Sequence, residues 1–267
     1  MIELSHAQAL AEVENGKPGP EVAAFFDLDG TLVAGFSAAP FVRHGLQTGQ
    51  LDGDFVADAL RIGAAGLLEG SGFEAILARS MRLYAGRAAN ELERLGQTLF
   101  DDFLRERLHA PIVELVFAHR ERGHTVVIAS SATQFQVDPV ARALGIEHVL
   151  CNRLAVDEAG RLTGELVGPL VHREGKARAI RAFAETHAND LAHGHFYADG
   201  GEDVPSMHLV GHPRPVNPAW RMRAAADRRG WPVIRVPETP GLRGGKPRGV
   251  GLRDAFVAAF VRTGRSS

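Results

Sequence analysis

The sequence predicts an α/β protein with a doubly wound parallel sheet, into which a long helical segment is inserted. Three short apolar runs, at 22–26, 125–129 and 195–198, each stop at a polar residue. Continuous apolar runs of this length are typical of strands that are buried on both faces of a parallel sheet. Helical patterns separate the runs, and this alternation favours a doubly wound sheet.

Two of the helical patterns have recognisable ends. Apolar residues recur at helical spacing over 111–122, and a glycine follows in the place of a C-terminal cap. A second helix is expected to start at Asn217 as N-cap, with Pro218 in its first turn, because these residues favour helix starts. We expect this helix to end at Gly230, before a strand over 231–236.

Two segments depart from the alternation of strands and helices. Between Ser37 and Ala110 we expect no strand. The helical patterns of this segment lie at 54–65, 73–84 and 88–108. An insertion after the first strand would lie over the carboxyl edge of the sheet as a cap domain. Residues 153–171 are instead expected to form a hairpin that turns at 158–160.

These segments predict the domain organisation of the 267-residue chain, which is long enough for one large domain or two modest ones. The predicted parts are an N-terminal extension over 1–20, an α/β core made of 21–36 and 111–236, a helical cap over 37–110, and a tail over 237–267.

Composition excludes several classes of protein. Hydrophobic residues make up 45% and charged residues 23% of the chain, which excludes disordered and fibrous proteins. The formal net charge of -2 predicts no nucleic-acid partner, unless a local basic patch is hidden in the total. The single cysteine, Cys151, agrees with a reducing compartment and with core packing. No signal peptide or membrane span is evident, so we expect a soluble, cytoplasmic protein.

The predicted tail has a composition of its own. A Pro/Gly-rich linker over 237–249 precedes an amphipathic helical pattern over 250–262. Residues 237–267 contain six Lys or Arg residues against two acidic residues. Two interpretations are open: the helix packs back on the domain, or it contacts a membrane surface, a partner or a neighbouring domain.

The strongest chemical signal is the segment Asp27-Leu28-Asp29-Gly30-Thr31, directly after the first apolar run. Carboxylates two residues apart in extended chain point the same way, and each raises the pKa of the other unless a cation lies between them. The pair indicates a divalent metal site or an acid/base pair. Gly30 allows backbone amides to approach an anion, and Thr31 can cap the structure that follows. The alternative is a turn with solvated acids.

The ends of the other runs carry further candidates. Ser130 can donate to a phosphate oxygen, with help from the amides that follow, beginning at Ser131. Lys176, at the start of a helical pattern, would neutralise carboxylates and hold a phosphoryl oxygen. Asp199 and Asp203 lie in a glycine-containing loop, and Mg²⁺ prefers such oxygen ligands. Structural alternatives are a helix N-cap for Ser130, a surface position for Lys176 and a solvated turn for the acids.

In this order and context, the segments resemble the four motifs of the haloacid dehalogenase-like hydrolases, which implies a Rossmann-like core. The matching residues are 27–31, Ser130, Lys176 and 199–203. The helical insertion resembles the C1-type cap of that superfamily. Three further segments resemble its phosphoserine phosphatase-like branch, subfamily IB: 153–154, 162–164 and 210–218. The resemblance covers about residues 21–236.

The resemblance implies a Mg²⁺-dependent phosphatase that hydrolyses a small organic phosphomonoester, a phosphorylated metabolite. Asp27 would be the nucleophile that forms an aspartyl-phosphate, and Asp29 would be the general acid and base. Mg²⁺ would be held by Asp27, by the backbone carbonyl of Asp29 and by Asp199, with Asp203 in support. The phosphoryl oxygens would be bound by Gly30, Thr31, Ser130, Ser131 and Lys176.

Two positions depart from the pattern of the family. Gly200 stands where a Ser usually follows the first acid of the fourth motif. Phe36 stands where phosphoserine-cleaving members have an acid for the ammonium group of the substrate, so phosphoserine is disfavoured. Further candidate substrate contacts in the cap are Arg43, His44, Arg79 and Arg82.

The sequence also leaves room for two other functions. The same motifs would serve phosphoryl transfer to an acceptor other than water. A phosphatase-like binding module is a further alternative, with the tail docked on a membrane or on a lipid acyltransferase partner. The pair His193 and His195 lacks Cys residues and spaced partners, so it does not predict a zinc site.

Overall fold

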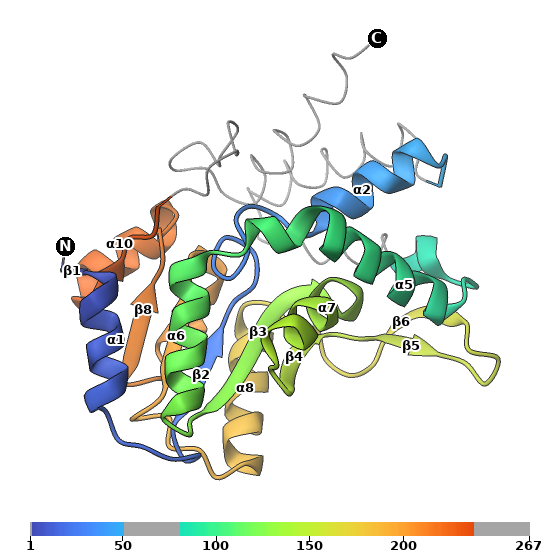
Figure 1. The fold of residues 1–267 in the computed structure, drawn as a ribbon. Helices are drawn as coiled ribbons and strands as arrows, with labels where there is room; N and C mark the ends of the chain where they lie inside the picture. Colours follow the sequence, from blue (N-terminus) through green and yellow to red (C-terminus); the bar gives the residue numbers. More distant parts are fainter. Residues whose placement is uncertain (1, 51–80, 238–267) are drawn as a thin grey trace.

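A five-stranded parallel sheet forms the centre of the molecule in the computed structural model, which describes residues 2–50 and 81–237 (Figure 1). Its strands are β2 (Ala23–Phe26), β3 (Thr125–Thr133), β4 (His148–Asn152), β7 (His195–Ala198) and β8 (His212–Pro215). They lie in the order β4-β3-β2-β7-β8, and every neighbouring pair is parallel. The three strands that the apolar runs predict are confirmed.

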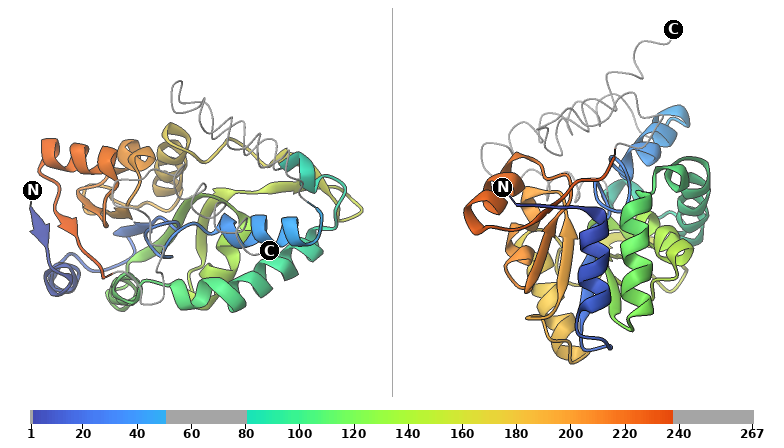
Figure 2. Two further views of the ribbon diagram at one scale, coloured as in Figure 1. Left: turned by 90° about the horizontal axis from the view of Figure 1, so that it is seen from above. Right: turned by 60° about the vertical axis from the view of Figure 1, so that its left-hand side comes forward.

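Helices cover both faces of this sheet (Figure 2). On one face lie α1 (His6–Asn15), α6 (Ala110–Glu121) and α7 (Gln134–Leu144); on the other lie α8 (Glu174–Thr186), α9 (Val204–Met207) and α10 (Trp220–Arg229). Strand β2 explains this division, because its side chains alternate between the faces. Ala24 and Phe26 pack with the first group of helices, while Ala23 and Phe25 pack with the second. The doubly wound α/β fold is therefore confirmed.

The insertion between β2 and β3 is helical where the structure describes it. It contains α2 (Ala38–Gln47), α5 (Ala89–Leu99), the π-turn η1 (Phe100–Leu104) and the 3-10 turn η2 (Arg105–Arg107). The predicted pattern at 54–65 and most of that at 73–84 lie outside the described residues, as does the tail beyond residue 237. A separate apolar cluster joins the insertion to α7, through residues such as Phe41, Leu92 and Phe135.

The predicted hairpin consists of β5 (Leu154–Val156) and β6 (Leu162–Leu166), which pair antiparallel. Asp157 forms the turn, because its Oδ1 accepts hydrogen bonds from the backbone N–H groups of Ala159 and Arg161, at 3.0 and 2.8 Å. Gly160 takes the positive φ of 74° that this turn requires. Leu154 and Leu162 belong to the same apolar cluster as the insertion, so the hairpin packs against it.

The first residues of the chain form elements that the sequence analysis did not assign. Strand β1 (Glu3–Leu4) pairs in parallel with β9 (Val233–Ile234), outside the main sheet. Helix α1 starts at a capping box between Ser5 and Gln8, and it packs against α6. Ala9 and Val13 are buried in the core as a result. The strand expected over 231–236 is thus shorter, and it pairs with β1.

The expected start of the helix before Gly230 was wrong, because α10 begins at Trp220 with Ala219 as its N-cap. Asn217 has a φ of 41°, which is not helical. Its side-chain Nδ2 instead donates to the carbonyl of Val236 at 3.0 Å, and its Oδ1 accepts from the N–H of Val236 at 3.2 Å. Gly230 ends the helix with a φ of 69°, as predicted. Among the described residues, no helix has the length and apolarity needed to cross a membrane.

Candidate active site

Acidic and polar side chains meet at the carboxyl edge of the three central strands. Asp27 follows β2, Ser130 lies in β3, and Asp199 follows β7. Because β2 lies between β3 and β7, these positions are neighbours in space. Lys176 reaches the same edge from the first turn of α8, and Asp203 comes from the short turn η3 (Gly201–Asp203).

Lys176 holds two of the acids together. Its Nζ lies 2.9 Å from Asp27 Oδ1 and 2.5 Å from Asp203 Oδ1. The side chains of Lys176 and Asp203 are each 1% exposed, so Lys176 is not a surface lysine and Asp203 is not in a solvated turn. Burial opposes the charge of the ammonium group, but Asp203 and Asp27 outweigh it and raise the pKa of Lys176.

Burial also raises the pKa values of Asp27 and Asp203, and the charge of Lys176 offsets only part of this rise. The single ammonium group of Lys176 therefore does not fully offset the cost of burying the negative charges of Asp27 and Asp203. A second cation among them would favour their ionised forms.

Gly30 makes room for a further carboxylate. A Cβ atom at this position would lie 2.4 Å from Oδ2 and 2.8 Å from Oδ1 of Asp199, so only glycine allows Asp199 to lie against the first motif. Oδ1 of Asp29 accepts a hydrogen bond of 2.7 Å from the backbone N–H of Ser37. The acids that this edge brings together, Asp27, Asp199 and Asp203, offer carboxylate oxygens, which suit a hard divalent cation such as Mg²⁺.

The serines of the second motif lie where β3 bends, since its register with β4 shifts between Ala129 and Thr133. Ser130 is buried, and its Oγ accepts a hydrogen bond of 3.1 Å from the N–H of Ala132. Ser130 is not a helix N-cap, because Thr133 and Gln136 form the capping box of α7.

Thr31 is fully buried, and none of the described groups forms a hydrogen bond with its Oγ1. A buried hydroxyl of this kind needs a partner, and a phosphoryl oxygen or a bound water would provide one.

His172 is a site residue that the sequence analysis missed. Its Nδ1 lies 3.2 Å from Oγ of Ser131, within hydrogen-bonding distance. Burial, followed by the positive charge of Lys176, lowers the pKa of His172 to about 4, so the imidazole is neutral at pH 7. The signal available in the sequence was its position four residues before Lys176, just ahead of the start of α8.

The residues of the cap that were predicted as substrate contacts are Arg43, His44, Arg79 and Arg82, and the three that the structure describes have different surroundings. Arg43 lies on α2 with its guanidinium 4.0 Å from the centre of the Phe103 ring. His44 lines a cavity of about 240 Å³ between α2 and α5. Arg82 is exposed, whereas Arg79 lies outside the described residues. Phe36 is directly followed by the Ser37 amide that bonds Asp29, so this segment borders the acidic edge.

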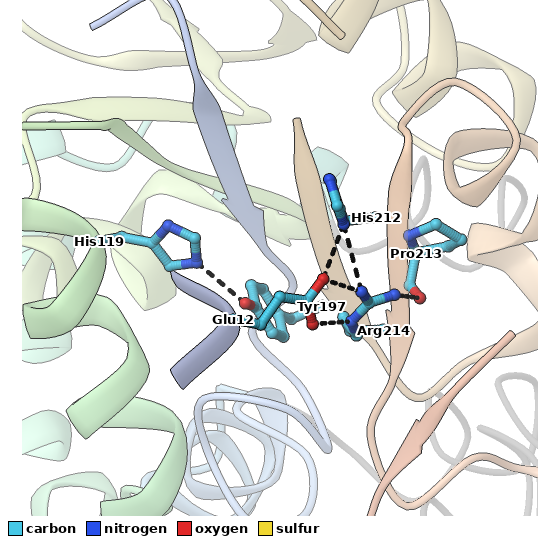
Figure 3. A network of polar contacts seen from close by, with 6 residues as sticks. All are labelled: Glu12, His119, Tyr197, His212, Pro213 and Arg214. Carbon is cyan, nitrogen blue, oxygen red and sulfur yellow. Dashed lines mark hydrogen bonds and ion pairs between the residues drawn. The ribbon is translucent and has the colours of Figure 1, made fainter. Parts of the chain in front are cut away.

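A second polar cluster lies at the amino edge of the sheet, where His195 and His212 begin β7 and β8. Figure 3 shows its polar contacts. Oε2 of Glu12, in α1, accepts a hydrogen bond of 3.0 Å from Nε of Arg214. Oε1 of Glu12 accepts a second hydrogen bond, from Nη2 of Arg214. Nδ1 of His212 lies 2.7 Å from the same Oε1. The carboxylate of Glu12 is thus already neutralised by a cation, the buried guanidinium of Arg214.

Buried rings extend this cluster. Nε2 of His119 lies 2.9 Å from the Tyr197 hydroxyl, and His195 stacks on His212 with ring centres 4.4 Å apart (Figure 3 labels all but His195). Ligand atoms of Glu12, His195 and His212 all lie within 4.8 Å of one another. Because Arg214 occupies this carboxylate, we assign the cluster to structure and not to zinc.

Comparisons with known proteins agree with this architecture. The sequence profile of the haloacid dehalogenase-like hydrolases matches residues 24–208. The chain is 32% identical over 229 residues to a probable phosphatase of Mycobacterium tuberculosis, covering 85% of this chain and 79% of the relative. It is also 32% identical over 216 residues to a phosphoserine phosphatase of the same organism, covering 79% and 70%. A histidinol-phosphatase of Neisseria meningitidis is 26% identical over 222 residues, covering 79% and 97%.

Solved structures share the fold. A Bordetella pertussis protein of unknown function matches with a TM-score of 0.68 and 27% identity, over 81% of this chain and 99% of that chain. A phosphoserine phosphatase solved as a phospho-aspartyl intermediate analogue matches in fold, with a TM-score of 0.58 and 18% identity, over 81% and 93% of the two chains. The chain therefore belongs to the haloacid dehalogenase-like hydrolases, in the branch that includes the phosphoserine phosphatases.

Proposed function

We propose that this chain is a Mg²⁺-dependent phosphatase that hydrolyses a small organic phosphomonoester through an aspartyl-phosphate on Asp27. The observation that carries the proposal is the buried contact of Lys176 with Asp27 and Asp203, beside the Asp199 carboxylate against Gly30. Membership of a hydrolase family, and relatives named as phosphatases, support the same reaction.

In the first step, the carboxylate of Asp27 attacks phosphorus, and the bond from phosphorus to the leaving oxygen breaks. Asp29 gives its proton to that oxygen, so an alcohol leaves. In the second step, Asp29 takes a proton from a water molecule that attacks the phosphoryl group. The bond to Asp27 then breaks, inorganic phosphate is released, and both carboxyl groups return to their starting states.

The buried ammonium group of Lys176 stabilises the negative charge that develops on the phosphoryl oxygens. Its position is already fixed, so no side chain or water has to reorient during the reaction. Ser130, Ser131 and Thr31 offer hydroxyl groups to the same oxygens, and Gly30 allows backbone amides to approach. Asp27, Asp199 and the backbone carbonyl of Asp29 would hold Mg²⁺, with Asp203 in support. The metal would shield the phosphoryl group from the negative charge of the nucleophile.

We propose that residues 37–110 form the cap that selects the substrate, over a core made of 21–36 and 111–236. Phe36 offers no charge to a substrate ammonium group, which argues against phosphoserine. The relatives named for phosphoserine and for histidinol phosphate show that similar chains are associated with different small phosphomonoesters. The substrate is therefore proposed by class, as a small phosphorylated metabolite.

The test is phosphate release from an aryl phosphate by the full chain, with Mg²⁺ and after its removal by EDTA. We expect release only with the metal, and we expect Asp27→Asn to lower it by at least about 10³-fold, since a neutral amide is a poor nucleophile. Glu158→Gln, in the exposed hairpin turn, is the matched control and should keep full activity. Retention of most activity by Asp27→Asn would show that Asp27 is not the nucleophile.

A further inference from the structure

Glu202 lies between the two acids of the fourth motif and folds back over Gly200. A Cβ atom at Gly200 would lie 2.4 Å from both Cδ and Oε1 of Glu202, and 2.7 Å from its Oε2. The carboxylate of Glu202 therefore fills the space that a side chain at residue 200 would take. This position depends on Gly200, because a side chain there would meet the carboxylate.

The carboxylate of Glu202 lies over Gly200, the residue that follows Asp199, and its negative charge acts on Asp27 and Asp203. Within the described ranges, no residue forms a hydrogen bond or an ion pair with Glu202. The single ammonium group of Lys176 is already shared by Asp27 and Asp203.

The charge balance of this edge calls for a second cation. Three carboxylates, those of Asp27, Glu202 and Asp203, act on one another around a single ammonium group, and a fourth, Asp199, lies against Gly30. Like charges that act on one another are unfavourable unless a cation lies between them. Oxygen is the only donor type among these groups, so a hard divalent cation fits better than a zinc or copper ion.

We propose that Glu202 supplies a further carboxylate to the divalent cation of this site, from the space that Gly200 leaves open. The inference rests on the proposed function for the existence of the metal site, and it adds a residue to that site. It predicts that the charge of Glu202 and the absence of a side chain at residue 200 both contribute to metal affinity.

The experiment is titration calorimetry of Mg²⁺, and separately of Mn²⁺, into the metal-free full chain in the absence of substrate. We expect Glu202→Gln to weaken the dissociation constant by about 10–100-fold, the range found when a group that supports a metal site is lost. Gly200→Ala should weaken it in the same way, because the added methyl group displaces the carboxylate. The double variant should be no weaker than Glu202→Gln alone.

Glu158→Gln is the control for loss of one negative charge, and it should bind both metals as the wild type does. Far-UV circular dichroism establishes that each variant is folded; if Glu202→Gln does not fold, Gly200→Ala gives the result. A change below about threefold in both variants would overturn the proposal, and so would a wild type that binds neither metal. Because no substrate is present, an incorrect assignment of Asp27 as nucleophile would leave this result unchanged.

Discussion

Lys176 is the residue on which the electrostatics of the acidic edge depends. Its ammonium group is buried between Asp27 and Asp203, so it neutralises charge that water cannot reach. A buried pair of this kind is weak evidence for net stability, but loss of one partner leaves an uncompensated charge. Lys176 therefore serves both the proposed chemistry and the folding of this edge.

We expect Lys176→Met to reduce phosphate release by about 10²–10³-fold, because a fixed positive charge toward the phosphoryl group is lost. We also expect it to lower the free energy of unfolding by about 3–5 kcal/mol in metal-free buffer. Added Mg²⁺ should restore part of this loss, since a ligand of the folded state stabilises it. Urea denaturation with and without the metal measures both effects. Lys17→Met, at an exposed lysine, is the control, and an equal response of the two variants would refute this account.

The candidate site could be predicted from the sequence only where residue type and position at a strand end coincide. Asp27, Ser130 and Asp199 follow or end apolar runs, so parallel pairing brings them together. His172 could not be found in this way, because it precedes α8 and its contact is with Ser131 in β3. The fold-back of Glu202 was equally hidden, since it depends on the backbone at Gly200.

At the scale of elements, the contact between α5 and α7 joins the insertion to the core. Gly96 permits it, because a Cβ there would lie 2.2 Å from the backbone oxygen of Phe135. Alanine at an open helical position would stabilise the helix by about 1 kcal/mol relative to glycine. A clash with the backbone of α7 cannot be relieved by a rotamer change, so α5 must move. Alanine at residue 96 is therefore expected to destabilise the protein, although alanine favours helices.

Gly96→Ala is therefore expected to lower the free energy of unfolding by about 1–3 kcal/mol, the usual cost of overpacking. Urea denaturation followed by circular dichroism measures this change. Thr98→Ala is the matched control, because it lies on the exposed side of the same helix and should gain a few tenths of a kcal/mol. A Gly96→Ala variant as stable as the wild type would show that the two helices tolerate a larger separation.

Element prediction succeeded where local pattern and tertiary use agree, and failed where a side chain has a distant partner. The segments 23–26 of β2, 126–129 of β3 and 196–198 of β7 are apolar and buried, so the pattern is sufficient. Asn217 has the composition of a helix start, yet it bonds the backbone of Val236 and stays outside the helix. Strand β1 has two residues, too few for a periodicity, and exists because β9 pairs with it.

At the scale of the whole molecule, the two edges of the sheet differ in their response to acid. The amino edge holds Glu12, whose carboxylate is stabilised against the cost of burial by His212 and Arg214, so its pKa is lowered to about 2. The same edge holds His195, whose pKa burial lowers to about 2. At the carboxyl edge, burial raises the pKa values of Asp27 and Asp203 instead.

The sign of each contribution follows from comparison with the unfolded chain. A carboxylate with a lowered pKa stabilises the fold above its ordinary value of 4.5, and this stabilisation is lost as the pH falls toward 2. A buried neutral histidine disfavours the fold below its ordinary value of 6.5, because only the unfolded chain then takes up the proton. Both groups of the amino edge therefore make stability fall with acid: His195 acts from about pH 6.5 downward, and Glu12 adds to it only below about pH 4.5. The raised values of Asp27 and Asp203 act in the opposite direction.

His195→Phe separates these contributions, because it keeps a ring in the stack and removes a titrating group. We expect the free energy of unfolding of the wild type to fall as the pH is lowered from 6.5 to 4.5, and we expect the variant to fall less over this range. Glu12→Gln should instead reduce the loss of stability below pH 4.5. At pH 7 it should lower the free energy of unfolding by about 2 kcal/mol, because Arg214 loses its counter-charge. Urea denaturation at a series of pH values measures each difference from the wild type, so the opposing effect of the carboxyl edge cancels. Parallel curves for His195→Phe and the wild type would show that His195 does not contribute to the acid sensitivity of the fold.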